Sequence, residues 1–328
     1  MKVKKKNMYT NIKIPWIEKY RPMVLNDILL SSYIKTKFNK MLEENNIPNL
    51  IITGEPGTGK TSTVLCLSKK LYSNEEYENS VLELNASDDR GLSVISNIIL
   101  PFCKKKMSYV RHKLIILDEA DSITTKAQNL LSNILTEPNK TKFIFICNDC
   151  TKINESIQSK CMIIKFPKIS YKNIFKKIQF ICEKENIKYN DKGIESLLFV
   201  SMNDIRKSIN NLECIYYSYG ELSENYVYDF VDIPKPVYIS NILKSILNKK
   251  LVDSINTIKE LYDKGYSPND ILLTFMKFLL EDKFNINEEL KLKIYEIVSI
   301  SYIRVNDGIQ TLLQLCGCIS KIHILLDK

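Results

Sequence analysis

Residues 50–61 read Leu50-Ile51-Ile52-Thr53-Gly54-Glu55-Pro56-Gly57-Thr58-Gly59-Lys60-Thr61, and a helical pattern follows from Ser62 to Leu71. An apolar strand, a glycine-rich loop and a helix start, in this order, are typical of a phosphate-binding loop. The glycines let backbone N–H groups and the helix N-terminus converge on phosphate oxygens, Lys60 reaches the outer phosphates, and Thr61 is placed to ligate Mg²⁺. An ordinary glycine-rich turn is the alternative, but it leaves the flanking strand and helix unexplained. The sequence therefore predicts nucleotide binding through residues 54–62.

A second apolar run, Leu114-Ile115-Ile116-Leu117, ends in Asp118-Glu119-Ala120-Asp121. At the carboxyl end of a buried parallel strand, Asp118 is expected to hold Mg²⁺ through water, and Glu119 to polarise the water that attacks the γ-phosphate. Acidic residues also favour the first turn of any helix, so a helix start is the alternative. Together with the phosphate-binding loop, the two carboxylates predict hydrolysis of the bound nucleotide.

Strand-like apolar runs at residues 50–53, 81–85, 114–117, 143–147 and 162–165 alternate with helical stretches. This alternation predicts an α/β fold: a parallel sheet with helices on both faces and a nucleotide crevice at the carboxyl ends of its strands. Amphipathic helices follow from Tyr171 to Val231. After an interruption at Pro234 and Pro236 the chain is helical again beyond Tyr238, where Leu272, Phe275, Leu279 and Leu280 form one apolar side. The predicted domains are a basic tail (1–14), a nucleotide-binding α/β domain (15–167), a helical lid (168–232) and a C-terminal all-α domain (233–328).

The composition limits the class of protein. With 328 residues and 45% hydrophobic content, the chain is long enough for two or three packed domains. No apolar run approaches the roughly 20 residues of a membrane span, and no signal-peptide core follows the N-terminal lysines, so we expect an intracellular protein. Nine scattered cysteines favour a reduced compartment. Only Cys147 and Cys150 have metal-like spacing, with Cys161 as a third candidate, which leaves a four-ligand zinc site incomplete.

The charge balance is basic, with 47 lysines and arginines against 38 acids and a net charge of +9, which is compatible with a polyanionic partner. The N-terminal run Lys2-Val3-Lys4-Lys5-Lys6 fits a nuclear-import or nucleic-acid-binding tail, although a solubilising tail is the favoured interpretation. The run Lys104-Lys105-Lys106 is weaker evidence, because a solvated loop explains it equally well.

Four segments carry a family resemblance, and they are Pro15-Trp16-Ile17-Glu18-Lys19-Tyr20-Arg21-Pro22, the phosphate-binding loop, Glu83-Leu84-Asn85-Ala86-Ser87-Asp88-Asp89-Arg90-Gly91 and Leu117-Asp118-Glu119-Ala120-Asp121. In their order and spacing they resemble the replication factor C small subunits, and subunit two is the most similar eukaryotic type. The resemblance extends over essentially the whole chain, including residues 210–212 and 316–322.

The resemblance implies an AAA+ ATPase subunit of a clamp loader, with ATP and Mg²⁺ as cofactors. It implies an AAA+ parallel-sheet domain, a helical lid and a C-terminal collar domain that takes part in oligomerisation. The implied partners are the other replication factor C subunits in a hetero-pentameric ring, the sliding clamp and primer–template DNA, and the implied localisation is the nucleus. The clamp-facing surface is expected near residues 98–103.

The resemblance also implies roles for single residues. Arg21 and Val24 match positions on the adenine and ribose side, Asn148 matches the polar sensor near the γ-phosphate, and Arg206 matches the lid arginine that reports ATP. The catalytic set is therefore Lys60, Asp118, Glu119, Asn148 and Arg206.

Two basic residues match positions that face the bore of the ring. Arg90 and Lys152 are expected to contact phosphates of duplex DNA without reading its bases. Each is alternatively an ordinary surface charge.

Three positions depart from the family pattern. Lys160 stands where the family has the arginine finger that completes a neighbouring subunit's ATP site, and lysine lacks the planar fork of arginine. Residues 130–135 contain no arginine pair, and Asn203 replaces a usual glycine. These departures leave a second hypothesis open, namely a scaffold subunit whose bound ATP is not turned over. Another P-loop enzyme, such as a nucleotide kinase, would need an acceptor pocket for which no residues are found.

Overall fold

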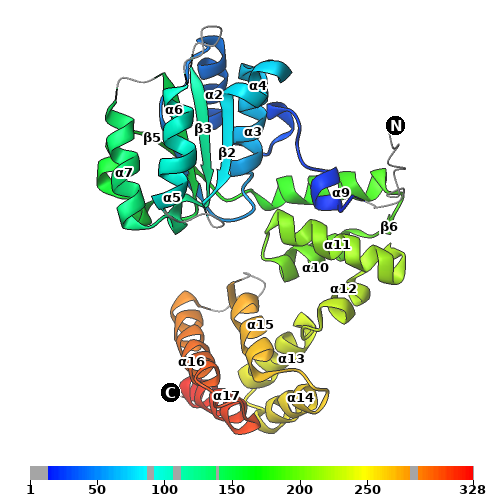
Figure 1. The fold of residues 1–328 in the computed structure, drawn as a ribbon. Coiled ribbons are helices and arrows are strands. Elements are labelled where there is room, and N and C mark those ends of the chain that lie inside the picture. The colour runs from blue at the N-terminus through cyan, green and yellow to red at the C-terminus, as the bar shows by residue number, and fades with distance from the viewer. Residues whose placement is uncertain (1–13, 87–91, 106–111, 138–139, 281–286, 328) are drawn as a thin grey trace, which may run out of the picture. The chain divides into compact units, whose positions relative to one another are not determined.

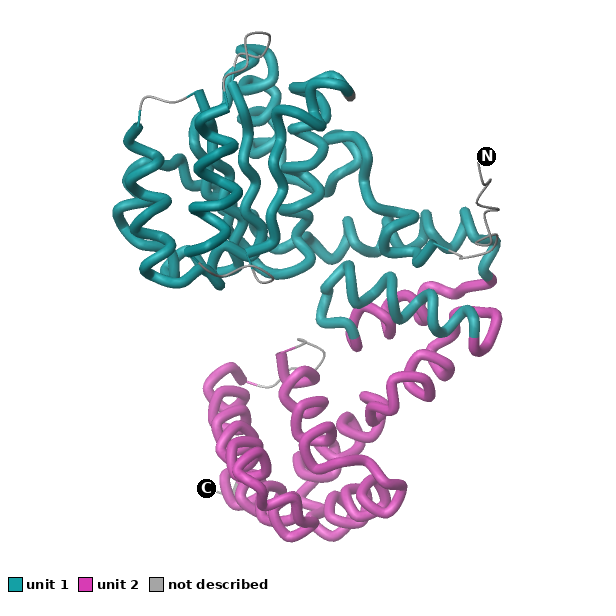
Figure 2. The backbone as a smooth tube through the Cα atoms, viewed as in Figure 1, with its two compact units in different colours: residues 1–187, 201–217 teal, residues 188–200, 218–328 magenta. Residues whose placement is uncertain are grey.

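The computed structural model describes residues 14–86, 92–105, 112–137, 140–280 and 287–327. The chain divides into two compact units, one formed by residues 1–187 and 201–217 and the other by residues 188–200 and 218–328 (Figure 2). This division assigns parts of the predicted lid, residues 168–232, to each unit. The predicted domain boundaries stay predictions.

The first unit is built on a five-stranded parallel sheet with the strand order β2-β3-β4-β1-β5 (Figure 1). The register places Ile51 of β1 beside Phe145 of β4 on one side and Ile163 of β5 on the other. The parallel α/β sheet predicted from the sequence is confirmed. The strands are β1 (Leu50–Gly54), β2 (Val81–Asn85), β3 (Lys113–Asp118), β4 (Thr141–Cys147) and β5 (Met162–Phe166).

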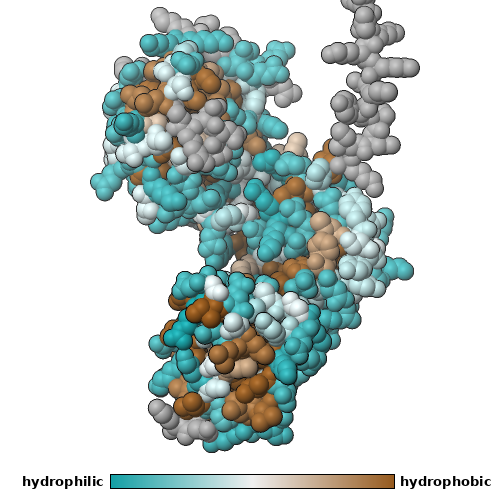
Figure 3. Space-filling model, turned by 60° about the horizontal axis from the view of Figure 1, so that its bottom comes forward, coloured by the Kyte–Doolittle hydropathy of each residue, from teal (hydrophilic) through white to brown (hydrophobic). Residues whose placement is uncertain are grey.

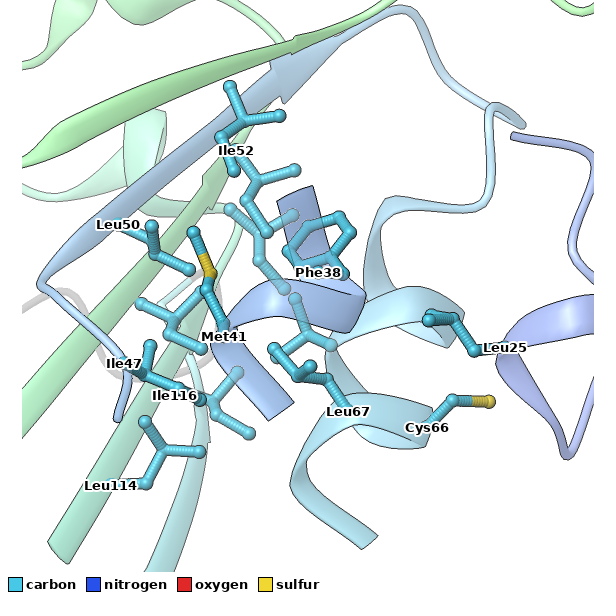
Figure 4. Packing of buried hydrophobic residues seen from close by; sticks show 14 of the residues in the cluster. Leu25, Phe38, Met41, Ile47, Leu50, Ile52, Cys66, Leu67, Leu114 and Ile116 are labelled. Atoms are coloured by element: carbon cyan, nitrogen blue, oxygen red, sulfur yellow. The ribbon is translucent and has the colours of Figure 1, made fainter. Parts of the chain in front are cut away.

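The central strands β1, β3 and β4 are buried on both faces, which explains why they are nearly continuous apolar runs. On one face, Leu50 and Ile52 pack with Phe38 of the helix α2 (Ser32–Glu43) and Leu67 of the helix α3 (Lys60–Leu71) (Figure 4). On the other face, Ile51 belongs to a separate cluster that includes side chains of the helix α7 (Thr125–Thr136). Because successive side chains of a strand alternate between faces, the central strands β1, β3 and β4 contribute to both clusters.

The helices of the first unit begin with α1 (Trp16–Lys19), η1 (Leu25–Asp27), α2 (Ser32–Glu43), α3 (Lys60–Leu71) and α4 (Asn74–Ser80). They continue with α5 (Leu92–Val94), the π-helix η2 (Ile95–Ile99), α6 (Leu100–Lys104), η3 (Ala120–Ser122), α7 (Thr125–Thr136), η4 (Cys150–Lys152) and α8 (Glu155–Gln158). The helix α9 (Tyr171–Lys184) and most of α11 (Ile205–Tyr219) complete the unit.

The second unit contains most of α10 (Asp191–Ser201), the short strands β6 (Lys188–Tyr189) and β7 (Glu221–Leu222), and the helices α12 (Glu224–Val231), α13 (Pro236–Leu247), α14 (Leu251–Asp263), α15 (Pro268–Leu280), α16 (Glu288–Asn306) and α17 (Leu312–Asp327). Sequence patterns did not predict the β6–β7 pair. The helices α13–α17 share one apolar core that includes Leu272, Phe275 and Leu279. Leu280 was predicted on the same apolar side, but it is 68% exposed, because one residue of helix turns it away from Leu279.

A buried lysine of β3 contacts the C-terminal end of the helix α6, and sequence patterns did not predict this contact. Lys113 is 5% exposed, and its ammonium donates to the carbonyl oxygens of Phe102, Cys103 and Lys105. Burial lowers the pKa of Lys113. These carbonyls lie at the negative end of the helix dipole, so the ammonium satisfies groups that a helix C-terminus leaves without partners.

All nine cysteines are free, and burial raises the pKa of Cys147 to about 11. Within the described ranges, no three His, Cys, Asp or Glu side chains gather as metal ligands. None of the helices that the structure describes is both long and apolar enough to cross a membrane.

The turn before α11 is left-handed at two successive residues, Met202 with φ of 54° and Asn203 with φ of 59°. Asparagine tolerates this conformation better than alanine does, and glycine adopts it without a steric penalty. We predict that Asn203→Ala lowers the stability of the full chain by roughly 1–2 kcal/mol, whereas Asn203→Gly leaves it unchanged or higher. Thermal unfolding followed by circular dichroism tests this, and equal melting temperatures for the two variants would contradict it.

Candidate nucleotide-binding site

A pocket of about 490 Å³ lies at the carboxyl ends of the strands in the first unit. This volume is within the usual range for small-molecule sites. Its lining includes most of the predicted nucleotide-binding and catalytic residues: Arg21, Pro56, Gly57, Thr58, Gly59, Lys60, Thr61, Ser62, Asp118, Glu119, Asn148 and Arg206. Gly54, Glu55 and Val24 are absent from the lining, although the carbonyl oxygens of Gly54 and Glu55 accept from Lys60.

The strand order explains why distant residues meet here. The loop after β1 carries Lys60 and Thr61, β3 ends in Asp118, and Asn148 follows β4. Since β4 lies between β3 and β1 and all three strands are parallel, their carboxyl ends meet at one edge of the sheet.

The ammonium of Lys60 contacts both the phosphate-binding loop and Asn148. It donates to Gly54 O at 2.7 Å, to Glu55 O at 2.9 Å and to Asn148 Oδ1 at 2.9 Å. Burial lowers the pKa of Lys60, while nearby groups that include Asp118 and Asp121 oppose that shift. The lysine thus ties the phosphate-binding loop to the end of β4.

The oxygens of Thr61 and Asp118 are adjacent. Thr61 Oγ1 donates to Asp118 Oδ2 at 2.8 Å, and Asp118 Oδ1 accepts from the backbone N–H of Glu119 at 2.9 Å. A hydroxyl and a carboxylate side by side match the oxygen ligands that Mg²⁺ prefers. Glu119 is exposed and has a left-handed φ of 53°, a conformation that is uncommon outside glycine and concentrates at functional sites.

Asp121 and Asp204 accept hydrogen bonds from backbone N–H groups in the site, and the sequence patterns had not indicated a role for either residue. Asp121 Oδ2 accepts from the backbone N–H of Asn148 at 3.4 Å, which helps to fix the start of that segment. Asp204 Oδ1 accepts from the backbone N–H groups of Arg206 at 2.8 Å and Lys207 at 3.3 Å, so it caps the start of α11. An Asp two residues before the lid arginine is the sequence signal of such a cap.

The lid contacts the loop directly. Gly57 has a φ of 77°, and a Cβ atom there would lie 2.5 Å from Asp204 Oδ1. Ile205, Arg206 and Ile209 of α11 line the pocket next to this contact. Glycine at position 57 therefore suits both the left-handed backbone conformation and the close approach of Asp204.

Lys152 and Lys160 are absent from the pocket lining. The ammonium of Lys160 donates to the backbone oxygen of Ser132 at 2.9 Å and to Ser132 Oγ at 2.8 Å, so the side chain folds onto α7. Lys152 is an exposed residue at the end of η4. Arg90 and Lys106 lie outside the described residues.

The sequence comparisons fit this site and fold. The model of the family described as "ATPase family associated with various cellular activities (AAA)" matches residues 50–168, and that of the "Replication factor C C-terminal domain" matches residues 234–321. The chain is 37% identical to replication factor C subunit 4 of Saccharomyces cerevisiae, over 97% of this chain and 98% of the relative. It is 36% identical to subunit 2 of Arabidopsis thaliana (95% and 94%) and 34% identical to subunit 5 of Homo sapiens (96% and 93%).

The chain belongs to the replication factor C small-subunit family. It is thus an ATPase subunit of clamp-loader type that binds nucleotide and assembles with other replication factor C subunits. A solved structure with the same fold is the Thermotoga maritima RuvB Holliday junction branch migration motor, with a TM-score of 0.55 and 14% identity over 80% of this chain and 91% of that one. This second likeness concerns the fold alone.

The contact between Gly57 and Asp204 leads to a prediction about the replication factor C subunit's loop. Gly57→Ala combines backbone strain with a collision, and we expect it to weaken ATP binding by more than about tenfold, equal to 1.4 kcal/mol. Gly220→Ala is a matched control, because Gly220 has the same φ of 77° and a Cβ atom there would meet nothing within 4 Å. Titration with a fluorescent ATP analogue measures both, and equal losses of affinity would contradict the prediction.

Proposed function

We propose that this subunit hydrolyses ATP in its own pocket, and that this turnover is coupled to loading of a sliding clamp onto primer–template DNA. The observation that supports this proposal is a pair of hydrogen bonds, from Lys60 to Asn148 and from Thr61 to Asp118. They bring together the phosphate-binding loop, the polar sensor residue and the acidic residue, which follow three different strands.

Each residue has a role that its position supports. Lys60 binds the outer phosphates, and Asn148, already bonded to Lys60, orients the attacking water. Glu119 polarises that water, and Arg206 on the lid reads the presence of the γ-phosphate. Arg21, whose Nε donates to Ser62 Oγ at 3.4 Å, lies on the part of the lining that is left for the adenosine.

Mg²⁺ would be held by Thr61 and Asp118, whose oxygens are adjacent. When bound, the ion would neutralise negative charge on the phosphates. Asp118 is oriented by the hydrogen bond that it accepts from the backbone N–H of Glu119. In this arrangement Asp118 would bind the metal, and Glu119 would polarise the attacking water.

The proposed assembly is a hetero-pentameric ring in the nucleus. The C-terminal unit exposes large apolar side chains, which appear as brown areas of its surface in Figure 3, and these suit contacts with neighbouring subunits. They include Val252 (69% exposed), Leu292 (69%) and Leu313 (78%).

The other proposed partners are the clamp and DNA. In the segment 98–103, Ile98 is 39% exposed while Ile99 is buried in the core, so only part of this segment is free to meet the clamp. Lys152 and Arg90 are proposed to contact DNA phosphates, which gives binding that weakens as salt rises.

Replacing Glu119 distinguishes this proposal from a scaffold subunit that binds ATP without turnover. In the complex assembled with its partner subunits, we predict that Glu119→Gln lowers the DNA- and clamp-stimulated turnover of this subunit's site by about 100-fold or more. Nucleotide binding should persist. Glu75→Gln on the exposed face of α4 is the control. An unchanged stimulated rate in the Glu119 variant would favour the scaffold.

Lys160 bears on the neighbouring site. Its ammonium is engaged by Ser132, and a lysine offers a point charge where an arginine finger offers two parallel donors, so we propose that it serves the neighbour poorly. We predict that Lys160→Arg raises hydrolysis by the assembled complex, because an arginine finger is worth on the order of 10³–10⁵ in rate at a site that it completes. Steady-state hydrolysis of the two complexes is the measurement, and identical rates would refute this role.

A further inference from the structure

The segment 15–22, which we call the strap, contains the four-residue helix α1. A helix this short is not stable by itself, because the conformational entropy lost in fixing the first turn exceeds the stabilisation from its hydrogen bonds. Its place on the protein must therefore come from contacts with other elements.

The first set of contacts is with the end of α9. Glu185 Oε1 accepts from Lys19 Nζ at 2.5 Å and from the hydroxyl of Tyr20. The Glu185 side chain is 16% exposed, against 49% for Lys19, and the ring of Tyr20 meets Phe180 edge-on at 6.5 Å. The carboxylate is thus enclosed by the strap.

Glu185 is not placed where it helps its own helix. It is the C-cap residue of α9, and a carboxylate at a helix C-terminus is disfavoured by the helix dipole. Burial raises the pKa of Glu185, but the hydrogen bonds from Lys19 and Tyr20 outweigh burial and leave the pKa below its usual value. The strap, not the helix, stabilises this charge.

The second set of contacts is with α11. Glu213 Oε2 accepts from the backbone N–H of Trp16 at 2.9 Å and so caps the start of α1. Trp16 is 3% exposed and packs against Tyr216 and Tyr217, with ring centroids 5.4 and 6.2 Å away. Glu213 lies two helical turns after Arg206, on the same side of α11.

The other end of the strap reaches the helix of the phosphate-binding loop. Arg21 Nε donates to Ser62 Oγ at 3.4 Å, and the thiol of Cys66 donates to Pro22 O at 3.3 Å, with both partner residues on α3. Five strap residues, Ile17, Glu18, Tyr20, Arg21 and Pro22, line the pocket. The loop residues bind phosphates, so the strap forms a wall of the part that remains for base and ribose.

We propose that Glu185 and Glu213 are positioning residues for nucleotide binding, which hold the strap against the lid so that it forms the base and ribose wall of the pocket. The inference rests on the proposed function, since it requires that this pocket binds ATP. It has a specific consequence. Loss of either carboxylate should weaken ligands that carry base and ribose, but not a ligand that consists only of phosphates.

The test compares ATP with tripolyphosphate, both in the presence of Mg²⁺, as ligands of the full chain. We expect Glu185→Gln and Glu213→Gln each to weaken ATP and ADP binding by about tenfold, equal to 1.4 kcal/mol, and to leave tripolyphosphate binding unchanged. Tyr20→Phe removes one of the two donors to Glu185 and should give a smaller loss with the same selectivity. Glu195→Gln, at an exposed position of α10, is the control and should change neither ligand.

The outcomes separate the two proposals. Equal weakening of ATP and tripolyphosphate would indicate a general folding defect and overturn the positioning role, as would unchanged binding of both ligands. If the unmodified chain bound neither ligand, the proposed function itself would fail. Weaker binding of ATP and ADP with unchanged binding of tripolyphosphate would support the inference, because a general folding defect would weaken the binding of all three ligands.

Discussion

The pairing order of three parallel strands is the constraint on which the site depends. Because β4 is hydrogen-bonded to both β3 and β1, the residues that follow these strands meet at one edge of the sheet. Lys60 can then reach Asn148 at 2.9 Å, and Thr61 can reach Asp118 at 2.8 Å. A slip of one residue in the register of β3 would turn Asp118 to the opposite face, so the buried apolar faces that fix the register also fix the chemistry.

The lid extends this constraint to the other side of the pocket. Asp204 caps α11 and lies against Gly57, so the position of Arg206 is set by a contact with the phosphate-binding loop itself. The strap joins the same helix through Glu213 and the loop helix through Arg21. The strap is thus connected to the lid helix and to the loop helix by partly buried hydrogen bonds, which are costly to break because their partners would lose hydrogen bonds away from water.

Particular residues show how far sequence reasoning reached. The strands, the glycine loop and the Asp118-Glu119 pair were predictable because each has a local pattern: an apolar run, a glycine spacing or an acidic pair after a strand. Lys113 was not predictable, since its partners are carbonyl groups of a helix end and carry no side-chain signature. The bond from Lys160 to Ser132 was also hidden, because 28 residues separate them and neither type is unusual on a surface. Leu280 was misplaced because helical periodicity does not show where an apolar stripe stops.

The sequence by itself determined the α/β class, the phosphate-binding loop and membership of a family, and it predicted residue types for metal and water, since local spacing and order encode these features. Only the tertiary structure decided which side chains meet: that Lys60 is bonded to Asn148, that Asp204 sits on Gly57, and that Glu185 and Glu213 hold the strap. The physical reason is that hydrogen bonds and packing act over a few ångströms between residues far apart in the chain. Distances of this kind are set by how elements pack, and no local pattern records them.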